Sequence, residues 1–315
     1  MFALRGIAVS LTFFVLAYCL LSLLVAVVWR LLDRLPTTKR GLADGLFALR
    51  VLPLAASAVI TFTFVVPSFQ LLEPRSIDEG MGIMPLTLGV CALLLIACGC
   101  FRVVAAQTRT ARVVSRWLED ARPFAGNAAA GNVTLCSRRT VPPLTLVGVR
   151  KPRVLIAASS VALLSHDELH IALKHELAHM RSRDNLKKLV FRFCPFPGMA
   201  KLESAWSQTA ELAADDAAVT RLADAIDLAS ALVKLSRLLP IETAPVCTVG
   251  FVTGSIGARV ARLLAWEEAG AGRARTAGIG SWIAAPAAVA ALACILATYG
   301  SALALTHEVT EWLVR

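Results

Sequence analysis

The sequence is poor in charged residues. Asp, Glu, Lys and Arg together make up 17% of its 315 residues, while 57% are hydrophobic and the mean hydropathy is +0.67. Soluble globular domains carry about 25% charged and about 45–50% apolar residues. This shortage of charge argues against a protein that is soluble throughout, and it favours one that lies partly in a membrane.

Charged residues are missing altogether from four long stretches, residues 6–29, 51–72, 80–101 and 276–306. A helix of about 20 apolar residues crosses the hydrocarbon of a bilayer. We therefore predict three transmembrane helices within residues 1–101, and a fourth with a short external tail within residues 276–315. Residues 102–275 carry charges throughout, which predicts one soluble domain between the third and fourth helices.

Positive charge is unevenly spread over the connecting segments. The first loop is rich in Lys and Arg, whereas residues 73–79 contain one Arg and three acids. The third apolar stretch is followed by four arginines before any acid. Because loops rich in Lys and Arg are retained on the cytoplasmic side, we expect the domain at 102–275 to face the cytoplasm. Both chain termini are then extracytoplasmic.

Two further features exclude common functions. The formal net charge is +10, but much of the basic excess flanks the predicted spans, so direct nucleic-acid binding is not expected. The eight cysteines include no C-x-x-C pair, and five of them lie in the predicted spans. We interpret them as reduced thiols rather than as disulfides or a cysteine zinc site.

Histidine is scarce, yet four of the five histidines fall within one segment of 16 residues. Ser165 followed by Glu168 is a capping box, which predicts a helix that starts there. On this helix His175 and His179 lie one turn apart on the same face and can reach one metal ion. With Glu176 they form the H-E-x-x-H pattern, in which the glutamate takes a proton from a metal-activated water.

The same helix carries a second histidine pair, His166 and His170. Asp167, Glu168 and Leu169 stand between them, which matches no metal-binding pattern of this kind. Both point well away from the face of His175 at about 100° per residue. We expect them to be surface or packing residues.

A catalytic zinc site needs a third protein ligand. Residues 205–220 are rich in alanine and free of Gly and Pro, which predicts a helix. Glu211 and Asp215 share one face of it, so Glu211 can complete the site while Asp215 accepts the remaining N–H of a ligating histidine. The alternative is an ordinary acidic helix face, and Asp216 is the next candidate ligand.

These motifs resemble those of the BlaR/MecR-type membrane metallopeptidases, which transduce antibiotic signals in bacteria. The similar segments are HELAHMRSRDN at 175–185 and ELAADDAAV at 211–219, and their separation is typical of that family. Three spans before the domain and one after it also fit. The penicillin-binding sensor domain of the best-known members does not follow the fourth span, so direct β-lactam sensing is not expected.

The resemblance implies an α-helical multi-pass membrane protein with a cytoplasmic α+β zincin-like (gluzincin) domain. One Zn²⁺ per chain would be held by His175, His179 and Glu211, with Glu176 as general base and then acid and Asp215 behind the ligands. The implied activity is a signal-transducing endopeptidase in the cell membrane. Its substrate would be a cytoplasmic transcriptional repressor or the enzyme itself, and a separate membrane sensor could supply the signal.

Two other functions remain open. An HtpX-type quality-control protease of the membrane shares the chemistry, but the short gap between His179 and Glu211 argues against it. A non-catalytic membrane receptor with a structural zinc is the second, and Glu176 argues against it because a structural site has no use for a general base. The residue that stabilises the oxyanion is not assigned, since both tyrosines, Tyr18 and Tyr299, fall in predicted spans.

Shorter patterns complete the expected domain. Residues 132–137, 144–149 and 153–158 predict strands of a small sheet; either of the last two could pair with a substrate backbone or only cover the helices. Residues 181–196 predict either a helix that lies on the cytoplasmic leaflet or a solvated helix with a buried apolar stripe. Residues 255–268 predict a helix that leads back to the membrane and offers no chemistry of its own.

Overall fold

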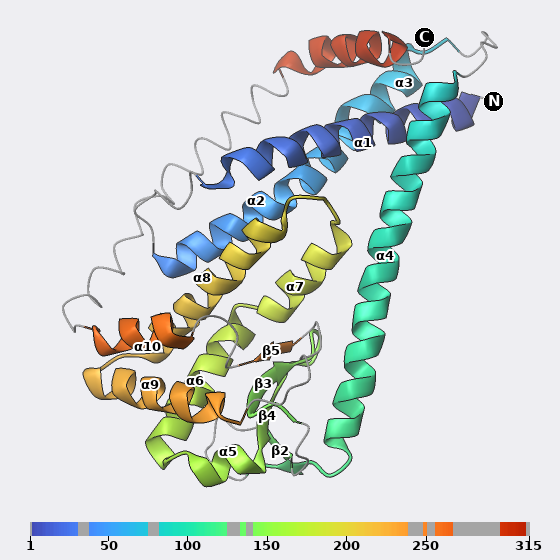
Figure 1. Ribbon diagram of the computed structural model, residues 1–315. Helices are drawn as coiled ribbons and strands as arrows, with labels where there is room; N and C mark the ends of the chain where they lie inside the picture. Colours follow the sequence, from blue (N-terminus) through green and yellow to red (C-terminus); the bar gives the residue numbers. More distant parts are fainter. Residues whose placement is uncertain are drawn as a thin grey trace.

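The computed structural model describes residues 2–30, 38–74, 82–124, 133–136, 141–238, 248–250, 256–266 and 297–312. Most of these residues are helical (Figure 1). The helices are α1 (Phe2–Val28), α2 (Lys39–Ile60), the π-helical turn η2 (Thr61–Val65), α3 (Val66–Leu72), α4 (Ile83–Leu118), α5 (Ala158–Leu163), α6 (His166–Arg181), α7 (Asp184–Phe193), α8 (Ala200–Ala218), α9 (Leu222–Ser236) and α10 (Ile256–Leu264). Residues 297–312 are helical as well.

Among the described residues, three helical segments are long and apolar enough to cross a membrane: α1, the run from α2 through α3, and α4. They contain the first three predicted spans, apart from Trp29, Gly82 and residues 80 and 81, and the last two lie outside the described residues. α4 continues beyond residue 101 to Leu118, because residues 102–118 include neither Gly nor Pro to end it. Most of the predicted fourth span, residues 276–296, lies outside the described residues.

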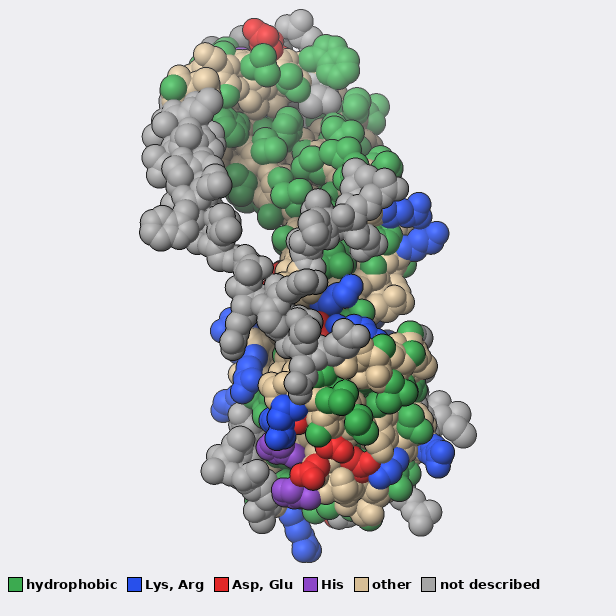
Figure 2. All heavy atoms as spheres, turned by 90° about the vertical axis from the view of Figure 1, so that its left-hand side faces the viewer, with side chains coloured by type: hydrophobic (Ala, Val, Ile, Leu, Met, Phe, Trp, Pro, Cys, Tyr) green, Lys and Arg blue, Asp and Glu red, His purple; other side chains and the backbone are tan. Residues whose placement is uncertain are grey.

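Hydrophobic and charged side chains separate along the length of the molecule. In Figure 2, hydrophobic side chains gather on the upper part, whereas Lys, Arg, Asp, Glu and His side chains gather on the lower part. Large apolar side chains stand out into solvent on all three apolar segments; Val27 is 76% exposed, Phe62 74% and Ile83 81%. An apolar surface of this extent is expected where a protein contacts lipid.

A five-stranded sheet lies at the opposite end of the molecule from the start of α1 (Figure 1). Its strands are β1 (Arg122–Pro123), β2 (Val133–Cys136), β3 (Leu144–Val147), β4 (Arg153–Ala157) and β5 (Thr248–Gly250), in the order β1-β2-β4-β3-β5. β2 and β4 are parallel, and the other neighbours are antiparallel. The three predicted strands are confirmed within two residues at each end, whereas β1 and β5 were not predicted.

The main core joins this sheet to helices α6, α9 and α10. It is built from buried apolar residues of β2, β3, β4, α6 and α9, with Leu263 from α10. The core members include Val133, Leu144, Leu146, Val154, Ile156, Leu169, Ala172, Leu228, Leu232 and Leu263. Because α6 is packed on the sheet on one side and against α8 and α9 on others, the face that carries the two H-E-x-x-H histidines is fixed in place.

The α7–α8 hairpin connects the sheet and its covering helices to the apolar helices α1, α2 and α4. Tyr18 of α1 donates a hydrogen bond to the Pro195 carbonyl at 3.1 Å, and Arg50 of α2 binds Glu203 of α8 at 3.0 Å. The absence of a side chain at Gly99 lets α4 approach the Phe193 backbone closely. Within segment 181–196, α7 begins at Asp184 and ends at Phe193, and its buried Leu189 and Phe191 form a stripe that packs against α4 as well as the domain. That the segment lies on the cytoplasmic leaflet stays a prediction.

Candidate metal centre

Helix α6 begins where the sequence predicted. Ser165 is the N-cap, and both hydrogen bonds of the capping box with Glu168 are present. The Glu168 carboxylate also receives Lys234 Nζ of α9 at 2.7 Å, and this pairing lowers its pKa although burial opposes the charge. The cap therefore fixes the start of α6 and its position against α9 at the same time.

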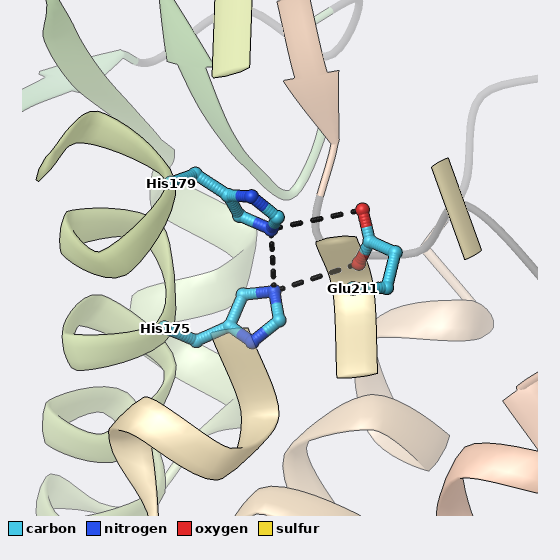
Figure 3. A group of neighbouring side chains, drawn as sticks. All are labelled: His175, His179 and Glu211. Atoms are coloured by element: carbon cyan, nitrogen blue, oxygen red, sulfur yellow. Dashed lines mark hydrogen bonds and ion pairs between the residues drawn. The ribbon is translucent and has the colours of Figure 1, made fainter. Parts of the chain in front are cut away.

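Three side chains converge between α6 and α8 (Figure 3). His175 and His179 extend from successive turns of α6, and Glu211 faces them from α8. The two histidine Nε2 atoms lie 3.1 Å apart. Glu211 Oε2 lies 3.5 Å from His175 Nε2, and Glu211 Oε1 lies 3.6 Å from His179 Nε2. All three residues are buried.

These separations fit a zinc ion. Zinc binds histidine nitrogen and carboxylate oxygen at about 2.0–2.2 Å in a tetrahedral arrangement, which puts neighbouring ligand atoms about 3.3 Å apart. The three observed separations of 3.1, 3.5 and 3.6 Å lie close to that value. Three protein ligands leave one position for water, which is the pattern of a catalytic rather than a structural site.

Each histidine is held from behind by an aspartate. His175 Nδ1 lies 3.0 Å from Asp215 Oδ1, and His179 Nδ1 lies 2.7 Å from Asp184 Oδ2. Both aspartates are buried. A carboxylate on Nδ1 fixes the tautomer in which Nε2 carries the lone pair for a metal. Asp215 lies where the sequence placed it, whereas Asp184 was missed as a partner of the site.

The turn between α6 and α7 brings Asp184 into position. Arg183 has a φ of 53°, in the left-handed region that non-glycine residues seldom adopt. This conformation reverses the chain sharply, so Asp184 starts α7 and points back at His179, five residues earlier. Asn185 supports the turn by donating to the carbonyls of Leu146 and Gly148 on the sheet side.

Glu176 lies beside the histidines and is fully buried. Burial raises the pKa of its carboxyl group to about 7, although His179 and His175 act in the opposite direction. A general base works best when its pKa is near the operating pH. Burial disfavours the charged form of His179 too, but Glu211 and Asp184 raise its pKa to about 10.

A fourth element, α10, reaches the site. The Arg259 guanidinium donates to both Glu211 and Asp215. His179, His175 and Arg259 hold the pKa of Glu211 well below its usual value, although burial opposes the charge. His175 and Arg259 likewise lower the pKa of Asp215. The expectation that helix 255–268 offers no chemistry was therefore wrong. A lone arginine in an amphipathic helix carries no spacing signal, so only the packing of α10 could reveal it.

The remaining candidates lie apart from the centre. His166 and His170 are exposed, as predicted. Asp216 forms an ion pair with Arg262 at the surface. Tyr18 and Tyr299 donate to the Pro195 and Thr63 carbonyls, so neither is an oxyanion donor at this site.

A buried His-His-Glu group that could hold a metal ion lies beside a buried glutamate, on helices packed against a small sheet. The chain belongs to the BlaR1 peptidase M56 family, whose model matches residues 52–263, from within α2 to α10. Membership of this family implies a metallopeptidase, and together with the three candidate membrane helices it supports membrane association. No curated protein matches the chain.

Proposed function

We propose that the protein is a membrane-embedded, zinc-dependent endopeptidase that transduces a signal. The observation that carries this proposal is the convergence of His175, His179 and Glu211 with Glu176 next to them in one buried group. When bound, zinc acidifies water and polarises a carbonyl group. The donor set of two imidazoles and one carboxylate suits zinc and supplies one site per chain.

The chain's own residues divide the proton chemistry. Glu176 accepts a proton from the attacking water and then delivers it to the leaving amine. Asp184 is hydrogen-bonded to His179 Nδ1, and Asp215 Oδ1 lies 3.0 Å from His175 Nδ1, so each carboxylate favours the tautomer that presents Nε2 to the metal. Burial raises the pKa of Glu176 to about 7, so this carboxyl group can both accept and release a proton near neutral pH.

The pairing of strands in the sheet supports the proposal that the enzyme cleaves itself. Of the two strands proposed for pairing with substrate, β4 is occupied on both sides, by β2 and β3. The other side of β3 pairs antiparallel with β5, with Leu146 opposite Val249. An extended segment of the same chain thus lies on the strand nearest the H-E-x-x-H helix, where substrate addition would occur. A cytoplasmic transcriptional repressor remains the second substrate candidate, and it could pair with β3 only by displacing β5.

We further propose a multi-pass arrangement of four spans with a zincin-like peptidase domain in the cytoplasm and both termini outside. The distribution of Lys and Arg around the apolar stretches supports it. The signal would then arrive through the spans or from a separate membrane partner. An HtpX-type quality-control protease and a non-catalytic receptor with a structural zinc are the competing functions.

Metal analysis of the purified full-length protein tests the activity. We expect about one zinc per chain. His175→Ala, His179→Ala and Glu211→Ala should lose zinc and peptidase activity together, whereas Glu176→Gln should keep zinc and lose turnover. Glu176→Gln in native membranes should also accumulate bound substrate or uncleaved chain. A protein that holds zinc but shows the same cleavage pattern with and without Glu176 would support the receptor instead.

A further inference from the structure

The guanidinium of Arg259 bridges two carboxylates of α8. Its Nε and Nη2 atoms donate to Asp215 Oδ2 and Oδ1 at 2.8 and 2.6 Å. Its Nη1 atom donates to Glu211 Oε2 at 2.9 Å. The side chain is 4% exposed, so these contacts are made away from solvent. A planar fork that binds a carboxylate through two nitrogens fixes the plane of that carboxylate as well as its position.

The two carboxylate groups that Arg259 binds lie close to the two histidines. Asp215 Oδ1 is also the atom that faces His175 Nδ1 at 3.0 Å. Glu211 Oε2 is engaged by Arg259, while Oε1 faces His179 Nε2 at 3.6 Å. One guanidinium thus sets the orientation of a candidate ligand and of the residue that orients another candidate ligand.

Charge gives a second reason for an arginine at this place. Glu211 and Asp215 lie one turn apart on α8 and are both buried, with Glu176 close by. Buried carboxylates that share a site repel one another. The positive charge of Arg259 offsets this repulsion, so the two side chains can lie side by side.

We propose that Arg259 is a positioning residue of the metal centre: it preorganises Glu211 and, through Asp215, His175 for zinc. The inference rests on the zinc site of the proposed function. It assigns to α10 a part in metal affinity, in addition to its part in the core through Leu263.

The zinc affinity of the full-length protein in detergent tests this proposal, measured by competition with a chromophoric chelator. Arg259→Gln should bind zinc about 10–100-fold more weakly than the wild type, the range expected when a group behind the ligands is removed. Arg259→Lys keeps the charge but loses the two-nitrogen fork, so its affinity should fall between the two.

Two matched controls separate positioning from general effects. Arg262→Gln removes an arginine from the next turn of α10, where the partner is Asp216 at the surface; its zinc affinity should stay within about twofold of the wild type. Leu263→Ala weakens the packing of α10, since Leu263 is 1% exposed; it should lower the melting temperature of the metal-free protein and leave the zinc affinity of the folded protein unchanged.

Arg259 acts partly through Asp215, so a double variant gives an independent readout. Arg259→Gln should weaken zinc binding less in an Asp215→Ala background than in the wild type. Wild-type affinity in Arg259→Gln, or an equal loss of affinity in Leu263→Ala, would overturn the proposal and leave the zinc site intact. If the wild-type protein itself bound no zinc, the proposed function would fail first.

Discussion

Asp184 Oδ2 lies 2.7 Å from His179 Nδ1, and this contact matches that of Asp215 with His175 at 3.0 Å. Both candidate histidine ligands therefore have a carboxylate behind them, one supplied by the turn after α6 and the other by α8. The two aspartates come from different elements, so the metal centre depends on the α6–α7 turn as much as on the packing of α8.

The first prediction concerns this pair. Asp184→Ala and Asp215→Ala should each weaken zinc binding about 10–100-fold without abolishing it, because each removes the acceptor that orients one imidazole. Chelator competition measures the effect. Asp216→Ala is the control, since Asp216 pairs with Arg262 at the surface. Unchanged affinity in Asp184→Ala would show that His179 needs no such partner.

Zinc binding should depend on pH through the histidines. The pKa of His179 is raised to about 10 in the metal-free protein, and that of His175 is raised too. Zinc must displace these protons, so its affinity should fall as the pH is lowered, and binding should release protons. Calorimetry in buffers of different ionisation enthalpy measures the number released. Asp184→Ala removes a group that raises the pKa of His179, so proton release should decline at a lower pH than in the wild type.

Glu176→Gln should stabilise the metal-free protein at alkaline pH. The pKa of Glu176 is 4.5 in its ordinary state and about 7 when folded. Folding therefore favours the neutral carboxyl group of Glu176. The free energy of unfolding gained from this preference is lost as the pH rises from about 4.5 through 7. The loss is on the order of 3 kcal/mol at most. Melting temperatures at pH 5 and pH 8 should diverge between wild type and variant, and parallel curves would contradict this account.

Gly99→Ala should loosen the contact between α4 and α7. A Cβ at residue 99 would overlap the carbonyl oxygen of Phe193, which is backbone and has little freedom to move. Overpacking of this kind costs about 1–3 kcal/mol. Gly89→Ala in the same helix is the control, because its Cβ would meet only ordinary contacts at 3.6 Å or more. Thermal melts of the detergent-solubilised protein should show a lower melting temperature for Gly99→Ala alone.

A fifth prediction tests orientation. A single cysteine at Ser76, outside the described residues, should react with a membrane-impermeant reagent in intact cells in a cysteine-free background. A single cysteine at Ser115, exposed on α4 beyond the apolar stretch, should react only after lysis. The opposite result would place the metal centre outside the cell and remove the case for a cytoplasmic substrate.

The sequence predicted those parts of the site that have fixed local spacing. A four-residue repeat on a helix puts His175 next to His179, and Glu211 next to Asp215, whatever the rest of the chain does. The capping box likewise located the start of α6 to the residue. The three predicted strands followed from short β-rich runs, the last two of which are set off by proline.

Other parts of the site depend on contacts between distant elements and left no local pattern. Asp184 became a partner of His179 because Arg183 adopts a left-handed conformation, which nothing about an arginine predicts. Arg259 is 48 residues from Glu211 in the chain. β5 is three residues long and pairs with β3 across about a hundred residues of chain, so its sequence gives no period to read. The packing of α8 against α2 is also a contact between distant segments, so no local pattern predicted it.

The close packing of α8 against the apolar helices determines whether the peptidase domain can be prepared without them. Leu202 and Trp206 of α8 and Met199, the residue before it, are buried together with Trp29, Ala43 and Leu46 from the first part of the chain. A version beginning at residue 102 would uncover that surface on the helix that carries Glu211, and we would expect it to aggregate rather than fold. The peptidase domain is therefore not independent of the apolar helices, because they cover the buried side of α8.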